Sequence, residues 1–136
     1  MSIRDEKYNL ISRIEFSITA YSVGYEEKTY IFKDYKVIAK TERMHNVDSL
    51  MVKCLNDEIK KDEFISALKE LRVMRWLRDY SPKNFDFSLC DTVLWHLKIY
   101  FSTERRPISI DGCNHFPPEF NSLLELFDIQ IIKNVK

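Results

Sequence analysis

The sequence predicts a single α+β domain over residues 1–136, in which a mostly antiparallel sheet is covered on one face by two helices. Apolar and polar residues alternate with a period of two in Leu10–Ala20 and again in Val93–Phe101, which is the pattern of a strand with one buried face. Apolar residues follow helical spacing after Asp62. A chain of 136 residues with 45% hydrophobic content is long enough for one ordinary core.

The first half of the chain is expected to form three strands, and the alternating segment Leu10–Ala20 is the first of them. After a turn at Gly24, a second alternation begins at Tyr30 and then changes phase. A bulge or a tight turn near residues 33–34 would explain this change. Residues 47–55 fit either a strand or a short helix, and we favour the strand.

A long helix is expected to follow, from Asp62 to Tyr80, because Asp62 is a suitable N-cap and the next apolar residues recur every three or four positions. The residues on this apolar face are Phe64, Ala67, Leu68, Leu71 and Met74. Pro82 would end the helix, since proline disfavours helical geometry in the residue before it. Residues 83–91 are expected to form a loop.

The C-terminal part is expected to form a hairpin and a second helix. The strand Val93–Phe101 buries alternate residues, and Trp95 should be among the most deeply buried. Ile108 and Ile110 belong to its hairpin partner. Pro118 at the first helical position begins a helix that continues to residue 127, and residues 129–132 form either a short strand or a packed tail.

The segment 95–120 has the most specific pattern in the chain. It reads W-x-L-x-I-x-Y, then a turn, a strand ending in G-x-N, and a helix start of the form aromatic-P-x-x-F. This pattern resembles a group of small, largely uncharacterised proteins of low-GC Gram-positive bacteria and their mobile elements. The resemblance covers residues 64–127, and Cys113, His115 and a second proline depart from it. It implies the fold and transfers no active site.

Composition and charge disfavour several classes of function. The chain has only two glycines, so it cannot contain a glycine-rich phosphate loop or the glycine-flanked nucleophile of many hydrolases. Its 21 basic and 21 acidic residues cancel, so the chain lacks the broad positive field that non-specific nucleic-acid binding requires. Neither a signal peptide nor an apolar run of membrane-spanning length is evident. A cytoplasmic protein without membrane contact is expected.

The cysteines indicate neither a disulfide nor a metal site. Cys54, Cys90 and Cys113 are odd in number and scattered. Cys113 and His115 are two residues apart, but this is not the spacing of a known zinc module. A cysteine–histidine catalytic pair would need an orienting third group, and no local pattern provides one. We therefore expect no cofactor, no metal and no enzymatic activity.

Arginines in the predicted long helix suggest a binding surface. They recur at i, i+3 and i+6, which would form a basic strip, and the guanidinium group binds both carboxylates and phosphates bidentately. A solvated helix end is the other explanation, because cations are favourable near a helix C-terminus. The exposed face of the second alternating strand is a further candidate. The candidate partner-binding residues are Arg72, Arg75, Arg78, His96, Lys98 and Tyr100.

These observations favour a non-enzymatic interaction protein of bacterial or phage origin, of a regulatory, immunity or defence-inhibitor type. Its expected partner is a protein that is acidic at the contact, with nucleic acid less favoured, and a homodimer through a sheet edge is a further expectation. The alternative is a small-ligand or nucleotide-binding module with a pocket near Trp95, Asn114 and His115. Asn114 also fits a backbone role, because asparagine tolerates a left-handed turn.

Overall fold

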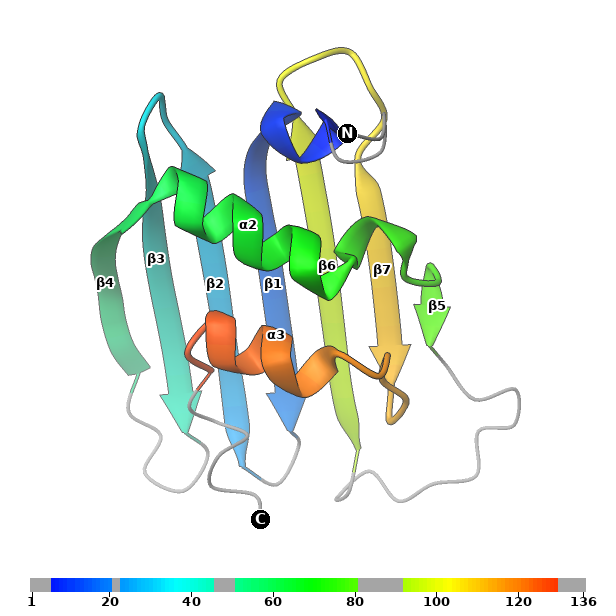
Figure 1. The fold of residues 1–136 in the computed structure, drawn as a ribbon. Helices are drawn as coiled ribbons and strands as arrows, with labels where there is room; N and C mark the ends of the chain where they lie inside the picture. Colours follow the sequence, from blue (N-terminus) through cyan, green and yellow to red (C-terminus); the bar gives the residue numbers. More distant parts are fainter. Residues whose placement is uncertain (1–5, 21–22, 46–50, 81–91, 130–136) are drawn as a thin grey trace.

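The computed structural model describes residues 6–20, 23–45, 51–80 and 92–129. Within these residues, seven strands form one sheet in the order β4-β3-β2-β1-β6-β7-β5, and helices α2 and α3 both cross the same face of it (Figure 1). The elements are the 3-10 helix η1 (Lys7–Leu10), β1 (Ile11–Ala20), β2 (Gly24–Phe32), β3 (Lys36–His45), β4 (Met51–Lys60), α2 (Lys61–Leu71), the 3-10 helix η2 (Val73–Arg75), β5 (Asp79–Tyr80), β6 (Val93–Phe101), β7 (Ile108–Cys113) and α3 (Phe120–Leu126). The predicted α+β fold is confirmed.

Neighbouring strands are antiparallel except at one edge, where β5 runs parallel to β7. A tight turn joins β2 to β3, as expected from the phase change, and the amide of Lys33 donates to the carbonyl oxygen of Lys36 at 2.8 Å. The strand predicted for residues 47–55 is present from Met51 onward, and residues 46–50 lie outside the described residues. β4 and the two-residue β5 are the sheet edges, and a homodimer through either edge stays a prediction.

The long helix predicted for Asp62–Tyr80 is wrong in its second half. Helix α2 ends at Leu71, and Arg72 adopts the left-handed conformation, with φ 53° and ψ 40°. The indole of Trp76 donates to the carbonyl oxygen of Leu71 at 3.0 Å and satisfies an acceptor that a helix end leaves open. Trp76 is buried, so the chain turns into η2 and β5 to place this ring in the core. Pro82 and the predicted loop 83–91 lie outside the described residues.

The C-terminal hairpin is confirmed, and the final helix starts later than predicted. Helix α3 begins at Phe120 rather than at Pro118. The amide of Phe120 donates to the carbonyl oxygen of Pro117 at 3.1 Å, so Pro118 lies in a turn that leads into the helix. Ile129 is buried, and its amide donates to the carbonyl oxygen of Leu124 at 3.0 Å; the rest of the predicted tail lies outside the described residues.

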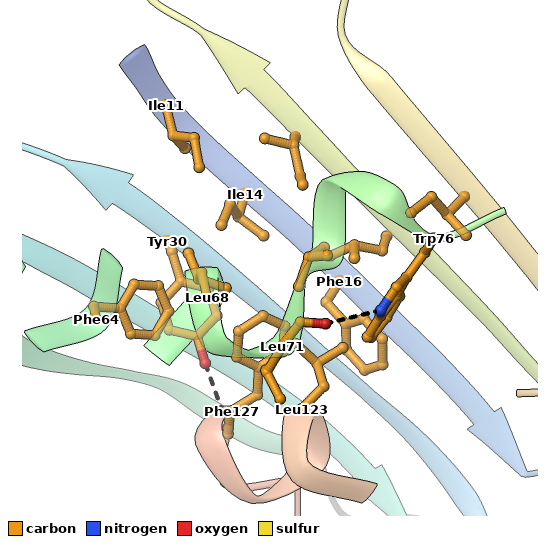
Figure 2. Packing of buried hydrophobic residues seen from close by; sticks show 14 of the residues in the cluster. Ile11, Ile14, Phe16, Tyr30, Phe64, Leu68, Leu71, Trp76, Leu123 and Phe127 are labelled. Carbon is orange, nitrogen blue, oxygen red and sulfur yellow. Dashed lines mark hydrogen bonds between the residues drawn. The ribbon is translucent and has the colours of Figure 1, made fainter. Parts of the chain in front are cut away.

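The core lies between the sheet and its two helices, and aromatic rings fill its centre (Figure 2). The ring of Tyr30 lies 4.8 Å from those of Phe64 and Phe127, so β2 contacts both helical segments. The Tyr30 hydroxyl donates to the carbonyl oxygen of Phe127 at 3.4 Å. Trp95 is fully buried, as predicted, and its ring is 4.7 Å from that of Phe120. The alternating strands therefore bury their apolar faces under the helices.

Candidate functional site

The three arginines of the predicted strip do not share a helix. Arg72 follows the last residue of α2, Arg75 ends η2, and Arg78 precedes β5; all three are exposed. The guanidinium of Arg78 donates to the carbonyl oxygen of Trp76 at 2.6 Å and approaches that of Met74 at 3.4 Å. Arg78 is therefore engaged with its own backbone segment, whereas Arg72 and Arg75 lie together at one concave surface.

This concave surface, which we call the cationic hollow, has a volume of about 830 Å³ and lies where η1, α2 and η2 meet. Its lining residues are Lys7, Tyr8, Lys69, Glu70, Arg72, Met74 and Arg75. Four are cations and one is a carboxylate. None of the four cations takes part in an ion pair within the described part of the chain. The hollow therefore has an excess of positive charge that the surrounding described residues leave unpaired.

Backbone hydrogen bonds hold the rim of the hollow in place. The amide of Met74 donates to the hydroxyl of the buried Tyr8 at 3.1 Å, which ties η2 to η1. The amide of Arg72 donates to the carbonyl oxygen of Lys69 at 3.0 Å, and the amide of Arg75 donates to the carbonyl oxygen of Arg72 at 2.9 Å. The two arginines thus project from a fixed backbone, and such pre-ordering lowers the entropy lost on binding.

Arg72 occupies a position where glycine is the usual residue, because its left-handed backbone follows a helix end. A side chain in this conformation costs roughly 1–2 kcal/mol. Attraction between a cation and the helix C-terminus gives about 0.3–1 kcal/mol when exposed. The free energy gained from this attraction does not exceed the cost of the left-handed backbone. Helix capping alone therefore does not explain why this position holds arginine rather than glycine. Backbone strain of this kind tends to occur at functional positions.

The uncovered face of the sheet carries the other predicted partner-binding residues. His96 is exposed there, and its Nδ1 is paired with the carboxylate of Asp111 on β7. The ammonium of Lys98 lies 5.1 Å from the centre of the Tyr100 ring, and the Tyr100 hydroxyl donates to Glu15 Oε1 at 3.1 Å. The structure therefore places all three predicted residues on one face, but each already has a partner within the sheet.

A neighbouring serine gives this face the residue order of a hydrolase triad without its geometry. Ser17 lies opposite His96 in the register of β1 and β6, and Asp111 lies on the other side of His96. No hydrogen bond joins Ser17 to His96 in the described structure. Both strands have neighbours on both sides, so their amides are used in the sheet ladder and offer no oxyanion hole.

The residues of the predicted ligand pocket take part in hydrogen bonds between the end of β7 and β6. Asn114 has φ 58°, as its predicted turn role implies. Its Oδ1 accepts a hydrogen bond from the amide of Val93 at 2.7 Å, and its own amide donates to the carbonyl oxygen of Val93 at 2.9 Å. The indole of Trp95 donates to the carbonyl oxygen of His115 at 3.0 Å. These bonds fasten the end of β7 to β6.

A small recess of about 270 Å³ lies beside this turn. It is mostly apolar, and neither Asn114 nor His115 lines it. Its lining residues are Val93, Phe116, Pro117, Pro118, Phe120, Asn121 and Leu124. A ligand in this recess would meet few polar groups that could fix its orientation, which specific small-molecule sites normally provide.

A charged cluster inside the fold was not anticipated from the sequence. Glu26 is fully buried and accepts a hydrogen bond from the Arg43 guanidinium at 3.1 Å. The ammonium of Lys28 lies 3.7 Å from the same carboxylate and donates to Thr41 Oγ1 at 2.8 Å. Burial lowers the pKa of Lys28, and the charge of Glu26 opposes this shift. The cluster contributes to the interior of the fold rather than to a surface site.

We found no matching protein-family model and no curated protein with significant sequence similarity. None of the helices in the described ranges is long and apolar enough to cross a membrane. The same residues contain no group of three or more potential metal ligands. Cys113 is a buried free thiol, and Cys90 lies outside the described residues.

Proposed function

We propose that the protein is a non-enzymatic binding protein that holds an acidic segment of another protein in the cationic hollow. The observation that carries the proposal is the gathering, around one concave surface, of four cations that form no ion pair with any of the described residues. The four cations repel one another. Binding of an anionic partner is therefore favoured both by its attraction to the cations and by the reduced repulsion among them. Arginine adds a planar fork that binds a carboxylate through two hydrogen bonds. A regulatory, immunity or defence-inhibiting role of a bacterial or phage protein would be exerted through this contact.

A protein partner is favoured over nucleic acid by the distribution of charge. The chain is neutral overall, so the positive charge of the hollow is local and is screened beyond about 8 Å at physiological salt. Nucleic-acid binding usually needs a longer basic surface.

A protein partner is also favoured over a small ligand beside Asn114 and His115. The side-chain oxygen of Asn114 and the carbonyl oxygen of His115 already accept hydrogen bonds from Val93 and Trp95. A ligand that used these oxygens would have to replace bonds that hold β6 and β7 together. Binding to the cations of the hollow would break no ion pair between described residues.

The test compares partner binding by the wild type, the Arg72→Ala/Arg75→Ala variant and the matched control Lys33→Ala/Lys40→Ala. The control removes two exposed lysines outside the hollow, so both variants change the net charge equally. A partner recovered with immobilised wild-type protein is purified, and its affinity is measured by calorimetry at two salt concentrations. Two lost contacts of about 1 kcal/mol each weaken binding roughly 30-fold.

The arginine variant should bind the partner roughly 30-fold more weakly, and its affinity should depend much less on salt concentration. The lysine control should bind with the wild-type affinity and the wild-type salt dependence. Both variants should unfold at nearly the wild-type temperature, because exposed charges contribute little to stability. Equal affinities for the two variants would show that the hollow is only a solvated helix end. The uncovered face at His96, Lys98 and Tyr100 would then be the next surface to alter.

A further inference from the structure

We propose, building on the function proposed above, that the group received by the cationic hollow is a phosphoryl group on a side chain of the acidic partner segment. The partner is thus recognised in its phosphorylated form.

The amount of charge matches a phosphate monoester better than a single carboxylate. Four cations and one carboxylate line the hollow, which leaves an excess of three positive charges. A carboxylate supplies one negative charge, whereas a phosphorylated side chain supplies about 1.5 to 2 at neutral pH in a group of similar size. A phosphoryl group therefore neutralises more of the excess without requiring several acidic side chains to enter together.

The directions of the cations also favour a phosphoryl group. Lys7 comes from η1, Lys69 from α2, and Arg75 from η2, so positive charge reaches the hollow from three separate elements. The two oxygens of a carboxylate lie in one plane and can be satisfied by one arginine fork. A phosphoryl group presents three acceptor oxygens in a tetrahedral arrangement. Donors on several elements around the hollow suit these three acceptors better than the two of a carboxylate.

The backbone at Arg72 is the second, independent observation. The residue lies on the rim with φ 53°, although glycine fits this conformation without strain. An Arg72→Gly variant should therefore be more stable than the wild type, with a melting temperature higher by about 3 °C. It should also bind a phosphoryl probe at least tenfold more weakly. A role in helix capping alone predicts the gain in stability without the loss of phosphate recognition.

The direct test uses two capped amino acids as probes, N-acetyl-O-phosphoserine methylamide and N-acetyl-glutamate methylamide. Each is titrated into the ¹⁵N-labelled protein at neutral pH, and amide chemical shifts are followed. The phosphoserine probe should bind at least tenfold more tightly, with the largest shifts at residues 69–75. Its affinity should fall below pH 6, where the phosphate loses its second charge. Equal affinity of the two probes, or shifts spread over the surface, would overturn the assignment.

A phosphatase arm separates this proposal from the proposed function. The purified partner is treated with phosphatase and its affinity is measured again, with Arg72→Gly and Lys33→Ala as the altered and control proteins. A loss of at least tenfold on treatment supports the phosphoryl group. A partner that binds equally after treatment, but still depends on Arg72, leaves the acidic-segment function standing and overturns the phosphoryl assignment. Inorganic phosphate that binds more tightly than the phosphoserine probe would also overturn it, because the hollow would then select a free anion.

Discussion

Replacing Gly112 with alanine should destabilise the protein by forcing Trp95 out of its position. Gly112 lies directly opposite Trp95 in the register of β6 and β7. A Cβ atom added to Gly112 would lie 2.7 Å from Cζ2 of the indole and still closer to its Nε1 and Cε2 atoms. Carbon atoms pack at about 3.5–4 Å. The indole or the strand must therefore move by a large fraction of an ångström or more.

The cost is large because Trp95 has little room to move. Its side chain is fully buried, its indole donates to the carbonyl oxygen of His115 at 3.0 Å, and its ring is 4.7 Å from Phe120 and 5.7 Å from Tyr80. Overpacking a core costs about 1–3 kcal/mol, and loss of the indole hydrogen bond adds about 1 kcal/mol. We expect a loss of roughly 3 kcal/mol and a melting temperature lower by about 10 °C.

The assay is urea unfolding of the wild type, Gly112→Ala, Trp95→Phe and the double variant, followed by far-ultraviolet circular dichroism. A phenyl ring lacks the atoms nearest the new methyl group, so the alanine should cost less than about 1 kcal/mol in the Trp95→Phe background. The coupling energy of the double-mutant cycle should then be about 2 kcal/mol. An equal cost of the alanine in both backgrounds would refute the explanation based on contact with the indole.

Two further predictions concern buried polar groups. Glu26→Gln should cost about 3–5 kcal/mol in thermal unfolding, because Arg43 and Lys28 lose their buried counter-charge; a cost below about 1 kcal/mol would show that the cluster is hydrated. Burial raises the pKa of Tyr30 above its ordinary value of 10.0, so the folded protein keeps this proton at a pH where the unfolded chain loses it. Stability should therefore fall as pH rises above about 10, less steeply in Tyr30→Phe, and equal pH slopes for the two proteins in urea unfolding would contradict this.

Local pattern predicted most of the sheet because a strand with one buried face is encoded by its own alternation. Ile14, Phe16 and Ile18 are buried in β1, and Leu97 and Ile99 are buried in β6, as the period of two requires. The same pattern could not identify Glu26 as buried, because an acidic residue in an alternating strand normally marks the solvent side. Its burial depends on cations from its own strand and from β3.

The error in the long helix shows where periodicity ceases to be informative. Met74 keeps the spacing of the apolar helical face, and Val73 and Trp76 would point to other faces of the same helix. In the structure, Val73 and Trp76 are instead buried through a left-handed residue, a 3-10 turn and a short strand. Helical propensity in such a segment is worth only tenths of a kcal/mol per residue. Burial of one tryptophan with a hydrogen-bonded indole outweighs several such terms.

The candidate site depended on the same change of direction. The sequence alone indicated that Arg72 and Arg75 belong to a basic segment, because their separation of three residues keeps them close in any helical turn. Nothing in the sequence placed Lys7 beside Lys69, since these residues come from segments more than sixty positions apart. The sequence spacing predicts that Arg78 belongs to the same surface, but Arg78 is not among the residues that line the hollow, and its guanidinium donates to the carbonyl oxygen of Trp76.

The α+β class, the alternating strands and the burial of Trp95 could all be predicted from the amino-acid sequence, because each follows from the polarity of residues that are neighbours along the chain. The end of α2, the distribution of charge over the two faces and the set of cations around the hollow could be seen only in the folded structure. Those features arise from packing between distant segments, in which the burial of Trp76 and the contact of Tyr8 with η2 outweigh local preference. The local sequence pattern carries no information about contacts between distant segments. The binding surface proposed for this protein is formed by such contacts.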